Sequence, residues 1–397
     1  MQHKERSDLK LKSTRRTKRE LLHYYLVSFS HSAVENIKLL LGGFTEMKKA
    51  KLFGFGLTAL ALTVALAACG GGKKDGTDST GGNSAVGDAD HSVVIVTDIG
   101  GVDDRSFNQS AWEGLQAWGK EHDLKKGADG FDYIQSNDAS EYVTNIDTAV
   151  SNGFKTVFGI GYLLADSIST AADANPDTQF GIIDSVIEGK DNVVSATFKD
   201  QEASYLAGVA AAHTTKTNTV GFIGVIDTAK ELNKDIKVEI EYAASFGDPA
   251  KGKALAASMY QKGADIIFHA SGGTGQGVFQ EAKDLNETGS KDKVWVIGVD
   301  SDQDKEGKYK TKDGKEDNFT LTSTLKGVGA AVQDISNRAL EDKFPGGEHL
   351  VYGLKDGGVD LTKGYLSDEA QKAVDKAKEE IIDEKITVPE VPKDVKE

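Results

Sequence analysis

The chain has 397 residues, 39% hydrophobic and 27% charged, which is enough for more than one buried core. Its formal net charge is −15, and from Cys69 onward 35 Lys or Arg stand against 57 Asp or Glu. Nucleic acid binds basic surfaces, so this balance excludes it as an expected partner. The single cysteine excludes an intrachain disulfide.

The first element is an export signal at residues 47–68, directly before Cys69. A lysine-rich start, 47–51, precedes an apolar stretch, 52–68, that ends in small residues. This order is typical of a signal peptide; a transmembrane helix is the alternative, for which the stretch is short. Residues 66–69 resemble the lipobox of bacterial lipoproteins. The resemblance implies that Cys69 is diacylated and anchors the protein at the extracytoplasmic face of the cell membrane.

Two further segments flank this signal. Residues 1–46 fit no signal peptide, because residues 21–46 separate their basic stretch from the apolar one. We interpret them as a misassigned upstream extension, with Met47 as the true start; a genuine cytosolic extension is the alternative. Residues 70–90 contain seven glycines among mostly polar residues, which indicates a flexible tether after Cys69. The folded part is expected to begin near His91.

From residue 91 onward, short apolar runs alternate with helical patterns. A first group of strands is predicted at 93–96, 131–135, 156–160, 179–183 and 193–197, with helices at 110–121, 140–152 and 164–175. A second group of strands is predicted at 219–224, 237–242, 264–269 and 294–299. Strands that alternate with helices indicate parallel sheets covered on both faces. We therefore predict an α/β fold with two doubly wound parallel-sheet domains and a ligand cleft between them.

Polar turns and aromatic rings accompany the predicted strand ends, and these lie at the sheet edge where open α/β sheets bind ligands. The residues concerned are Asp98, Asp104, Phe107 and Asn108 after 93–96, Asp184 after 179–183, Phe268 and Gly273 at the end of 264–269 and in its turn, and Asp300 after 294–299. A ring there can stack on a flat ligand, and carboxylates accept hydrogen bonds from hydroxyl or N–H groups. The alternatives are that the rings belong to the core and that the aspartates cap helices.

Five motifs in order resemble the basic membrane protein family of substrate-binding lipoproteins, which includes purine nucleoside receptors of ABC importers. They are Asp-x-Gly-Gly-x-Asp-Asp-x-Ser-Phe-Asn at 98–108 and the segments 205–208, 247–252, 271–279 and 297–300. The resemblance covers the chain from Met47 onward and implies a type I periplasmic-binding-protein fold. It also implies a monomeric binding protein rather than an enzyme, with a nucleoside as ligand and an ABC permease and its ATPase as partners.

The resemblance further implies how the chain divides into domains. Residues 91–198 and 326–344 are expected to form the N-terminal domain. Residues 199–322 and 349–366 are expected to form the C-terminal domain, and 367–397 a C-terminal helix and tail.

Site roles also follow from the resemblance. In the family, two aromatic rings enclose a purine ring, at positions that match Phe107 and Phe268. The base edge is met at positions matching Asp104 and Asp184, with Asn108 nearby, and the ribose hydroxyls at positions matching Asp98, Asp300 and Lys326. Gly273 belongs to the ligand-binding glycine turn. The residues alone favour a solvated lysine at a helix start for Lys326.

Other functions have weaker support. The glycine turn 273–277 followed by Asp300 resembles a dinucleotide fingerprint, but the glycine spacing differs. The five histidines after residue 90 have no metal-ligand spacing and the chain has no second thiol, so we predict no catalytic set, metal site or cofactor. A sugar receptor of the same architecture and an exported nucleoside-acting enzyme remain alternatives.

The chain departs from the family between the predicted strands 219–224 and 237–242. Residues 225–235 are the whole connection, whereas a parallel crossover needs about a dozen residues or more. We therefore expect one face of the second sheet to lose its cover. An exposed apolar face predicts that this copy is aggregation-prone or non-functional.

Overall fold

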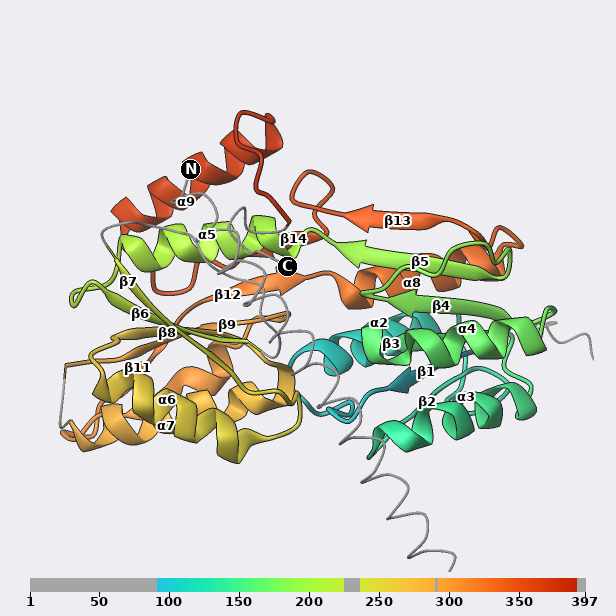
Figure 1. Ribbon diagram of the computed structural model, residues 1–397, viewed down its shortest axis with the longest axis horizontal. Coiled ribbons are helices and arrows are strands. Elements are labelled where there is room, and N and C mark those ends of the chain that lie inside the picture. The colour runs from blue at the N-terminus through green and yellow to red at the C-terminus, as the bar shows by residue number, and fades with distance from the viewer. Residues whose placement is uncertain (1–90, 225–235, 290–291, 391–397) are drawn as a thin grey trace, which may run out of the picture. The chain divides into compact units, whose positions relative to one another are not determined.

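The computed structural model describes residues 91–224, 236–289 and 292–390 (Figure 1). The proposed upstream extension, signal peptide, lipidated Cys69 and tether lie outside the described residues, and so does the short connection 225–235. No helix within the described ranges is long and apolar enough to cross a membrane.

The first sheet has six strands, all parallel, in the order β13-β5-β4-β3-β1-β2. Their bounds are β1 (Val93–Thr97), β2 (Phe131–Ile134), β3 (Thr156–Ile160), β4 (Gln179–Ile183), β5 (Val193–Phe198) and β13 (His349–Tyr352). Every residue of β1 is buried, which fits its unbroken apolar run. Successive side chains of β1 serve two different cores: Val93 and Ile95 belong to one hydrophobic cluster, Val94 and Val96 to another.

Helices supply the rest of these two cores. The cluster that holds Ile95 includes residues of α2 (Phe107–Glu121) and α8 (Val328–Leu340), and the cluster that holds Val94 includes residues of α3 (Tyr142–Ser151) and α4 (Ala165–Ala174). The helices α2 and α8 approach closely, because a Cβ added to Gly114 would lie 2.2 Å from the carbonyl oxygen of Gly329. The first sheet is therefore covered on both faces, as a doubly wound domain requires.

The second sheet also has six strands, in the order β14-β12-β9-β8-β6-β7, with only β14 antiparallel. Their bounds are β6 (Thr219–Gly224), β7 (Lys237–Tyr242), β8 (Ile266–Ala270), β9 (Trp295–Gly298), β12 (Thr320–Lys326) and β14 (Val359–Leu361). One face packs on α6 (Pro249–Gln261) and α7 (Gly275–Thr288), and α5 (Asp200–Ala212) contacts β12, β14 and α9 (Asp368–Ile382). The predicted α/β fold with two parallel-dominated sheets is confirmed.

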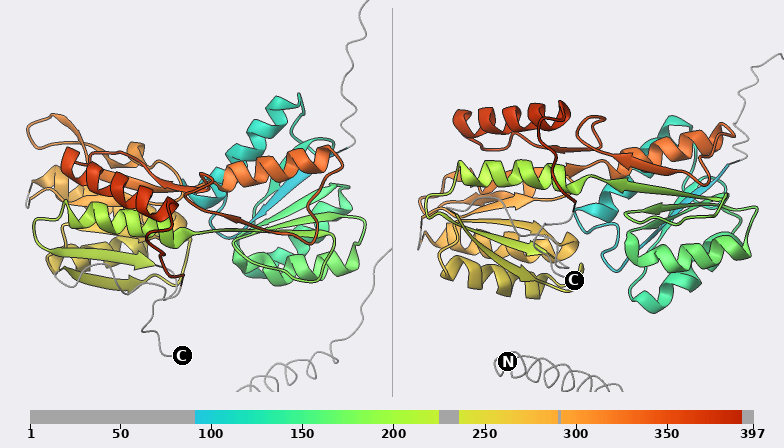
Figure 2. Two further views of the ribbon diagram at one scale, coloured as in Figure 1. Left: turned by 90° about the horizontal axis from the view of Figure 1, so that it is seen from above. Right: turned by 45° about the horizontal axis from the view of Figure 1, so that its top comes forward.

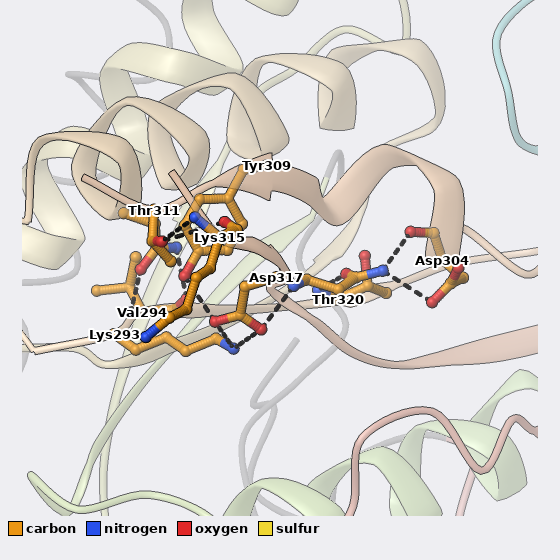
Figure 3. A network of polar contacts seen from close by, with 10 residues as sticks. Lys293, Val294, Asp304, Tyr309, Thr311, Lys315, Asp317 and Thr320 are labelled. Carbon is orange, nitrogen blue, oxygen red and sulfur yellow. Dashed lines mark hydrogen bonds and ion pairs between the residues drawn. The ribbon is translucent and has the colours of Figure 1, made fainter. Parts of the chain in front are cut away.

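A small hairpin of β10 (Lys308–Lys310) and β11 (Glu316–Asn318) follows β9. Lys293 Nζ lies 2.8 Å from both carboxylate oxygens of Asp317, and the Tyr309 hydroxyl donates to the same carboxylate at 2.9 Å (Figure 3). Asn318 Nδ2 donates to Asp304 at 2.8 Å. These hydrogen bonds thereby fix the short 3₁₀ helix η4 (Asp304–Gly307). Three further 3₁₀ helices of the described residues are η1 (Ala139–Glu141), η2 (Tyr162–Leu164) and η3 (Gly272–Thr274).

The expected domain division needs one correction. Strand β13, expected in the C-terminal domain, pairs with β5 of the first sheet, with His349 opposite Ser195 and Tyr352 opposite Phe198. The chain thus returns to the first sheet after α8, and it is β14 that joins the second sheet. The chain passes between the sheets after β5, after β12 and after β13 (Figures 1 and 2). The sequence analysis did not predict β10 to β14 as strands.

The side of β6 and β7 that faces away from α6 is partly exposed. Val238 is 39% exposed, and Val220, Phe222 and Ile240 are only half-buried. On the opposite side Ile223 is fully buried. Both strands have the bounds that the sequence predicts, whereas the effect of the short connection between them stays a prediction.

Candidate functional site

The carboxylate of Asp104 fixes the turn from β1 into α2 by hydrogen bonds. Its oxygens accept hydrogen bonds from the backbone N–H groups of Ser106 (2.9 Å), Asn108 (2.9 Å) and Gln109 (3.1 Å). N–H groups at a helix start have no partner within the helix, so Asp104 caps α2, in keeping with the alternative interpretation of the aspartates. Burial raises the pKa of Asp104, and these hydrogen bonds oppose the rise.

The side chain of Asn108 joins two buried carboxylates. Its Nδ2 donates to Asp98 Oδ1 at 2.8 Å and to Asp104 Oδ2 at 3.0 Å, and the N–H of Gly100 also donates to Asp98 Oδ1 at 2.9 Å. Asn108 is 2% exposed, and its Oδ1 is buried without a hydrogen-bond partner. An unpaired buried acceptor is unfavourable, and either an ordered water or a ligand donor would satisfy it.

Asp184 and Asp300 occupy equivalent places, one at the end of β4 and one just after β9. Both have left-handed backbones, with φ of 61° and 65°, which is uncommon outside glycine but tolerated by aspartate. The Ser106 hydroxyl donates to Asp300 Oδ2, a contact between the loop after β1 and the second sheet. Burial raises the pKa of Asp300 to about 7, against the lowering effects of Lys326 and of this hydroxyl.

Lys326 ends β12 and is not a solvated lysine, because its side chain is only 11% exposed. Its Nζ lies 2.6 Å from Asp184 Oδ2 and 2.8 Å from Asp200 Oδ2. It also lies 5.2 Å from the ring centre of Phe107 and 5.5 Å from that of Phe198. Burial alone would lower the pKa of Lys326, but the three carboxylates of Asp184, Asp200 and Asp300 outweigh it and hold that pKa above its ordinary value.

The two predicted rings lie in different surroundings. Phe107 is half-buried. Its ring lies beside Gly161, just after the end of β3, where an added Cβ would be 3.5 Å from the ring. Phe268 instead lies within β8, two residues before the strand ends, and its ring centre is 5.5 Å from that of Phe222 on the neighbouring strand. It packs against the hydrophobic core. Phe268 thus belongs to the packing of the second sheet, and its role in ligand binding stays a prediction.

Another ring, Phe246, lies at the contact between the two domains. It follows β7, and its ring centre is 6.2 Å from that of Tyr162, which follows β3 of the first sheet. Sequence reasoning missed Phe246, although it carried the same signal as Phe107: an aromatic ring in a polar turn after a strand. Asp200 was also missed, and no local pattern marks it as a partner of Lys326.

The glycine turn is filled by the chain itself. Cβ atoms added to Gly275 and Gly277 would lie 2.1 Å from His269 and 1.8 Å from the carbonyl oxygen of Pro249. Gly277 permits close packing of α7 on α6, and Gly275 permits close approach to His269 of β8. The dinucleotide interpretation thereby loses the space it needs for a pyrophosphate. Gly273 lies at the contact between the domains, where an added Cβ would be 3.7 Å from the Cβ of Asp104.

The loop after β1 is also held by side chains of the second domain. Gln303 Nε2 donates to the carbonyl oxygen of Arg105 at 2.9 Å, and the Ser301 hydroxyl donates to the same oxygen at 3.2 Å. The Arg105 side chain forms an ion pair with Glu306. The loop that carries Asp98, Phe107 and Asn108 thus contacts both domains.

No group of three or more His, Cys, Asp or Glu able to hold a metal ion occurs within the described ranges. His269 of β8 is fully buried, and its Nε2 lies 3.0 Å from Gln303 Oε1. Burial lowers the pKa of His269 to about 4, so it is neutral at physiological pH. Its surroundings are those of a structural histidine that fixes Gln303.

Comparison with known proteins decides the family. The protein-family model described as "ABC transporter substrate-binding protein PnrA-like" matches residues 91–391. The chain belongs to this family. The predicted resemblance is confirmed, and this PnrA-like protein is a substrate-binding protein of the ABC transporter class.

Named relatives agree with this assignment. The PnrA-like chain is 52% identical over 357 residues to the "ABC transporter nucleoside-binding protein BmpA" of Lactococcus lactis subsp. cremoris, covering 86% of this chain and 99% of the relative. It is 33% identical over 330 residues to the "Basic membrane protein A" of Borreliella burgdorferi, covering 78% and 91%. An ABC transporter solute-binding protein from Aeropyrum pernix K1 has a similar structure, with a TM-score of 0.65, 21% identity and coverage of 77% and 94%. At that identity the last comparison concerns the fold alone.

Proposed function

We propose that this PnrA-like protein is the lipid-anchored receptor of an ABC importer, and that it binds a purine nucleoside between the carboxyl edges of its two sheets. The name of the Lactococcus relative, a nucleoside-binding protein at 52% identity, supports the ligand class. The observation that carries the proposal is the buried, unpaired Asn108 Oδ1 next to the half-buried ring of Phe107. A purine base offers a flat face for such a ring and N–H groups for such an acceptor.

In this proposal the base stacks between Phe107 and Phe246. Phe246 replaces Phe268 as the second ring, since the ring of Phe268 packs against Phe222 within the second sheet. Asn108 Oδ1 accepts a hydrogen bond from the base. Asp104 acts indirectly by fixing Asn108, because backbone and side-chain N–H groups already fill its carboxylate.

The sugar is bound by charged side chains from the edges of both sheets. Asp300 and Asp98 accept hydrogen bonds from ribose hydroxyls, and the Lys326 ammonium, paired with Asp184, donates one. Gly273 leaves room for the ligand beside Asp104. Carboxylates and an ammonium together suit a neutral, hydroxyl-rich group rather than a phosphate, because three carboxylates near the site repel anions.

Delivery follows from the class of protein. We propose that two acyl chains on Cys69 hold the monomeric receptor at the extracytoplasmic face, and that the loaded receptor hands the nucleoside to a permease driven by its ATPase. The protein performs no chemistry on the ligand in this proposal.

A ligand panel tests the proposed function. Melting temperature is measured with inosine, guanosine, adenosine, ribose and galactose, and the mixture with inosine is checked afterwards for free hypoxanthine. A rise in melting temperature with purine nucleosides, and intact inosine, are expected. A rise with the sugars alone would replace the nucleoside with a sugar as ligand, and release of hypoxanthine would make the protein an enzyme.

A further inference from the structure

The Lys326 ammonium is held by two aspartates from different parts of the fold. Asp184 follows β4 of the first sheet, and Asp200 is the first residue of α5, at the passage of the chain from the first sheet to the second. Lys326 itself ends β12, just before the chain passes back to α8. The three residues therefore join the first sheet to two of the connections between the sheets.

The geometry leaves at least one ammonium donor of Lys326 without a hydrogen-bond acceptor among the described residues. A lysine ammonium has three N–H donors; one donates to Asp184 Oδ2 at 2.6 Å, and Asp200 Oδ2 forms an ion pair with the same ammonium at 2.8 Å. Within the described part of the chain, Asp300 makes no ion pair within 4.0 Å of Lys326, although its charge acts on the lysine. The lysine is thus bound to Asp184 and Asp200 in preference to Asp300.

This pair differs from an ordinary surface ion pair. The Asp200 side chain is 55% exposed, whereas that of Lys326 is 11% exposed and lies within 5.5 Å of the Phe107 and Phe198 ring centres. A lysine side chain is long and flexible, and Asp300 offers it another carboxylate. Without Asp200, we expect the ammonium to move toward Asp300, which would fill the acceptor that the ligand needs.

We propose that Asp200 is a positioning residue for ligand binding. It holds the Lys326 ammonium against Asp184, so that a remaining N–H of Lys326 and the Asp300 oxygen that does not accept from Ser106 are both open to the sugar hydroxyls of a nucleoside. The proposal rests on the proposed function, because it assigns Asp200 a role at the same site. It adds that affinity for the sugar depends on a residue that does not itself touch the ligand.

The test combines protein variants with ligands that lack one hydroxyl. Dissociation constants are measured for inosine and for its 2′-deoxy, 3′-deoxy and 5′-deoxy forms, with the full chain and with Asp200→Asn and Asp200→Glu. Asp368→Asn is the matched control, because Asp368 is also an exposed first residue of a helix, α9, and its loss has the same effect on a helix dipole. The melting temperature of each variant is measured as well.

In Asp200→Asn we expect inosine affinity to fall about tenfold, as loss of a charge-assisted contact does. We also expect the loss of affinity on removal of at least one ribose hydroxyl to be smaller in Asp200→Asn than in the unmodified chain, because the Lys326 ammonium that recognises this hydroxyl is displaced. Asp200→Glu keeps the charge and should restore much of that penalty, and Asp368→Asn should leave every ratio unchanged.

Two results would overturn the assignment of Asp200 while leaving the nucleoside function intact. One is an Asp200→Asn protein whose deoxy penalties equal those of the unmodified chain. The other is equal losses in Asp200→Asn and Asp368→Asn, which would make the effect one of helix stability. An unmodified chain that binds none of these nucleosides would instead refute the proposed function, and the role of Asp200 with it.

Discussion

Gln303 Nε2 lies 2.9 Å from the carbonyl oxygen of Arg105, and this hydrogen bond joins the second domain to the loop that carries Phe107 and Asn108. Arg105 has a left-handed backbone, with φ of 58°. The other end of the Gln303 amide is fixed, because Oε1 accepts a hydrogen bond from Val299 N–H at 3.0 Å and lies 3.0 Å from His269 Nε2. The second domain thus presents a donor already aimed at the loop.

Replacing Gln303 with Ala should destabilise the protein and weaken ligand binding. Gln303 is 4% exposed, and its loss would leave the Val299 N–H and His269 without their partner. Each unsatisfied buried group costs about 1–3 kcal/mol of unfolding free energy. Denaturant unfolding and inosine titration measure the two effects. Ser301→Ala is the control, since its longer contact with Arg105 comes from a half-buried side chain. Equal effects of the two substitutions on the unfolding free energy and on inosine affinity would contradict this role of Gln303.

The two candidate rings should separate binding from stability. Phe246→Ala should weaken nucleoside binding by about 1–3 kcal/mol, as loss of a stacked ring does, with little change in melting temperature. Phe268→Ala should lower the melting temperature, because its ring packs against Phe222 and the core, and should leave the dissociation constant near that of the unmodified chain. The opposite pattern, with affinity lost in Phe268→Ala alone, would restore Phe268 as the second ring.

Asp300 predicts a pH dependence with a definite sign. Its pKa in the folded protein is raised to about 7, above the ordinary value of 3.8, so the folded state binds the proton more tightly than the unfolded state. This group's contribution to stability is therefore present at low pH and is lost as pH rises through about 7. Asp300→Asn should remove that part of the pH dependence of the unfolding free energy. Asp98 and Asp104, whose pKa values are also raised by burial, remain in both proteins and cancel in the comparison.

The same group gives binding the opposite trend. An ionised Asp300 accepts hydrogen bonds from hydroxyls better than a protonated one does, so inosine affinity should rise between about pH 6 and about pH 8. Isothermal titration across that range measures the trend. A flat profile in the unmodified chain would remove Asp300 from the contacts to the sugar.

The anchor prediction concerns Cys69, which lies outside the described residues. Cys69→Ala should release the protein from membranes, because stable anchoring needs two acyl chains and the variant has no cysteine to carry them. Fractionation of cells that express either form measures it. Equal membrane retention of both forms would contradict lipidation at this residue.

The sequence predicted the first-order architecture because the pattern of apolar runs is local. The bounds of β6 and β7 match the predicted runs, and Asp184 and Asp300 lie just beyond strand ends as expected. Residues 349–352 were assigned to the wrong domain, because a short, partly exposed segment carries no local information about the strand it pairs with.

Side-chain roles were harder to predict than positions. Whether Phe268 lies within the sheet or at its edge depends on the residue at which β8 ends. An error of two residues in that predicted end changes the role assigned to Phe268. Asp104 looked like a ligand group, but the N–H groups it accepts from are set by the turn into α2. Asp200 and Lys326 meet only through the fold, so no spacing in the sequence could have paired them.

A crystal structure of the protein with inosine bound tests the central claim most directly. The account predicts the base between the rings of Phe107 and Phe246, with Asn108 Oδ1 accepting a hydrogen bond from the base and Lys326 and Asp300 at the ribose. Inosine bound elsewhere, or a complex in which Asn108 Oδ1 remains unpaired and Lys326 lies away from the sugar, would contradict it.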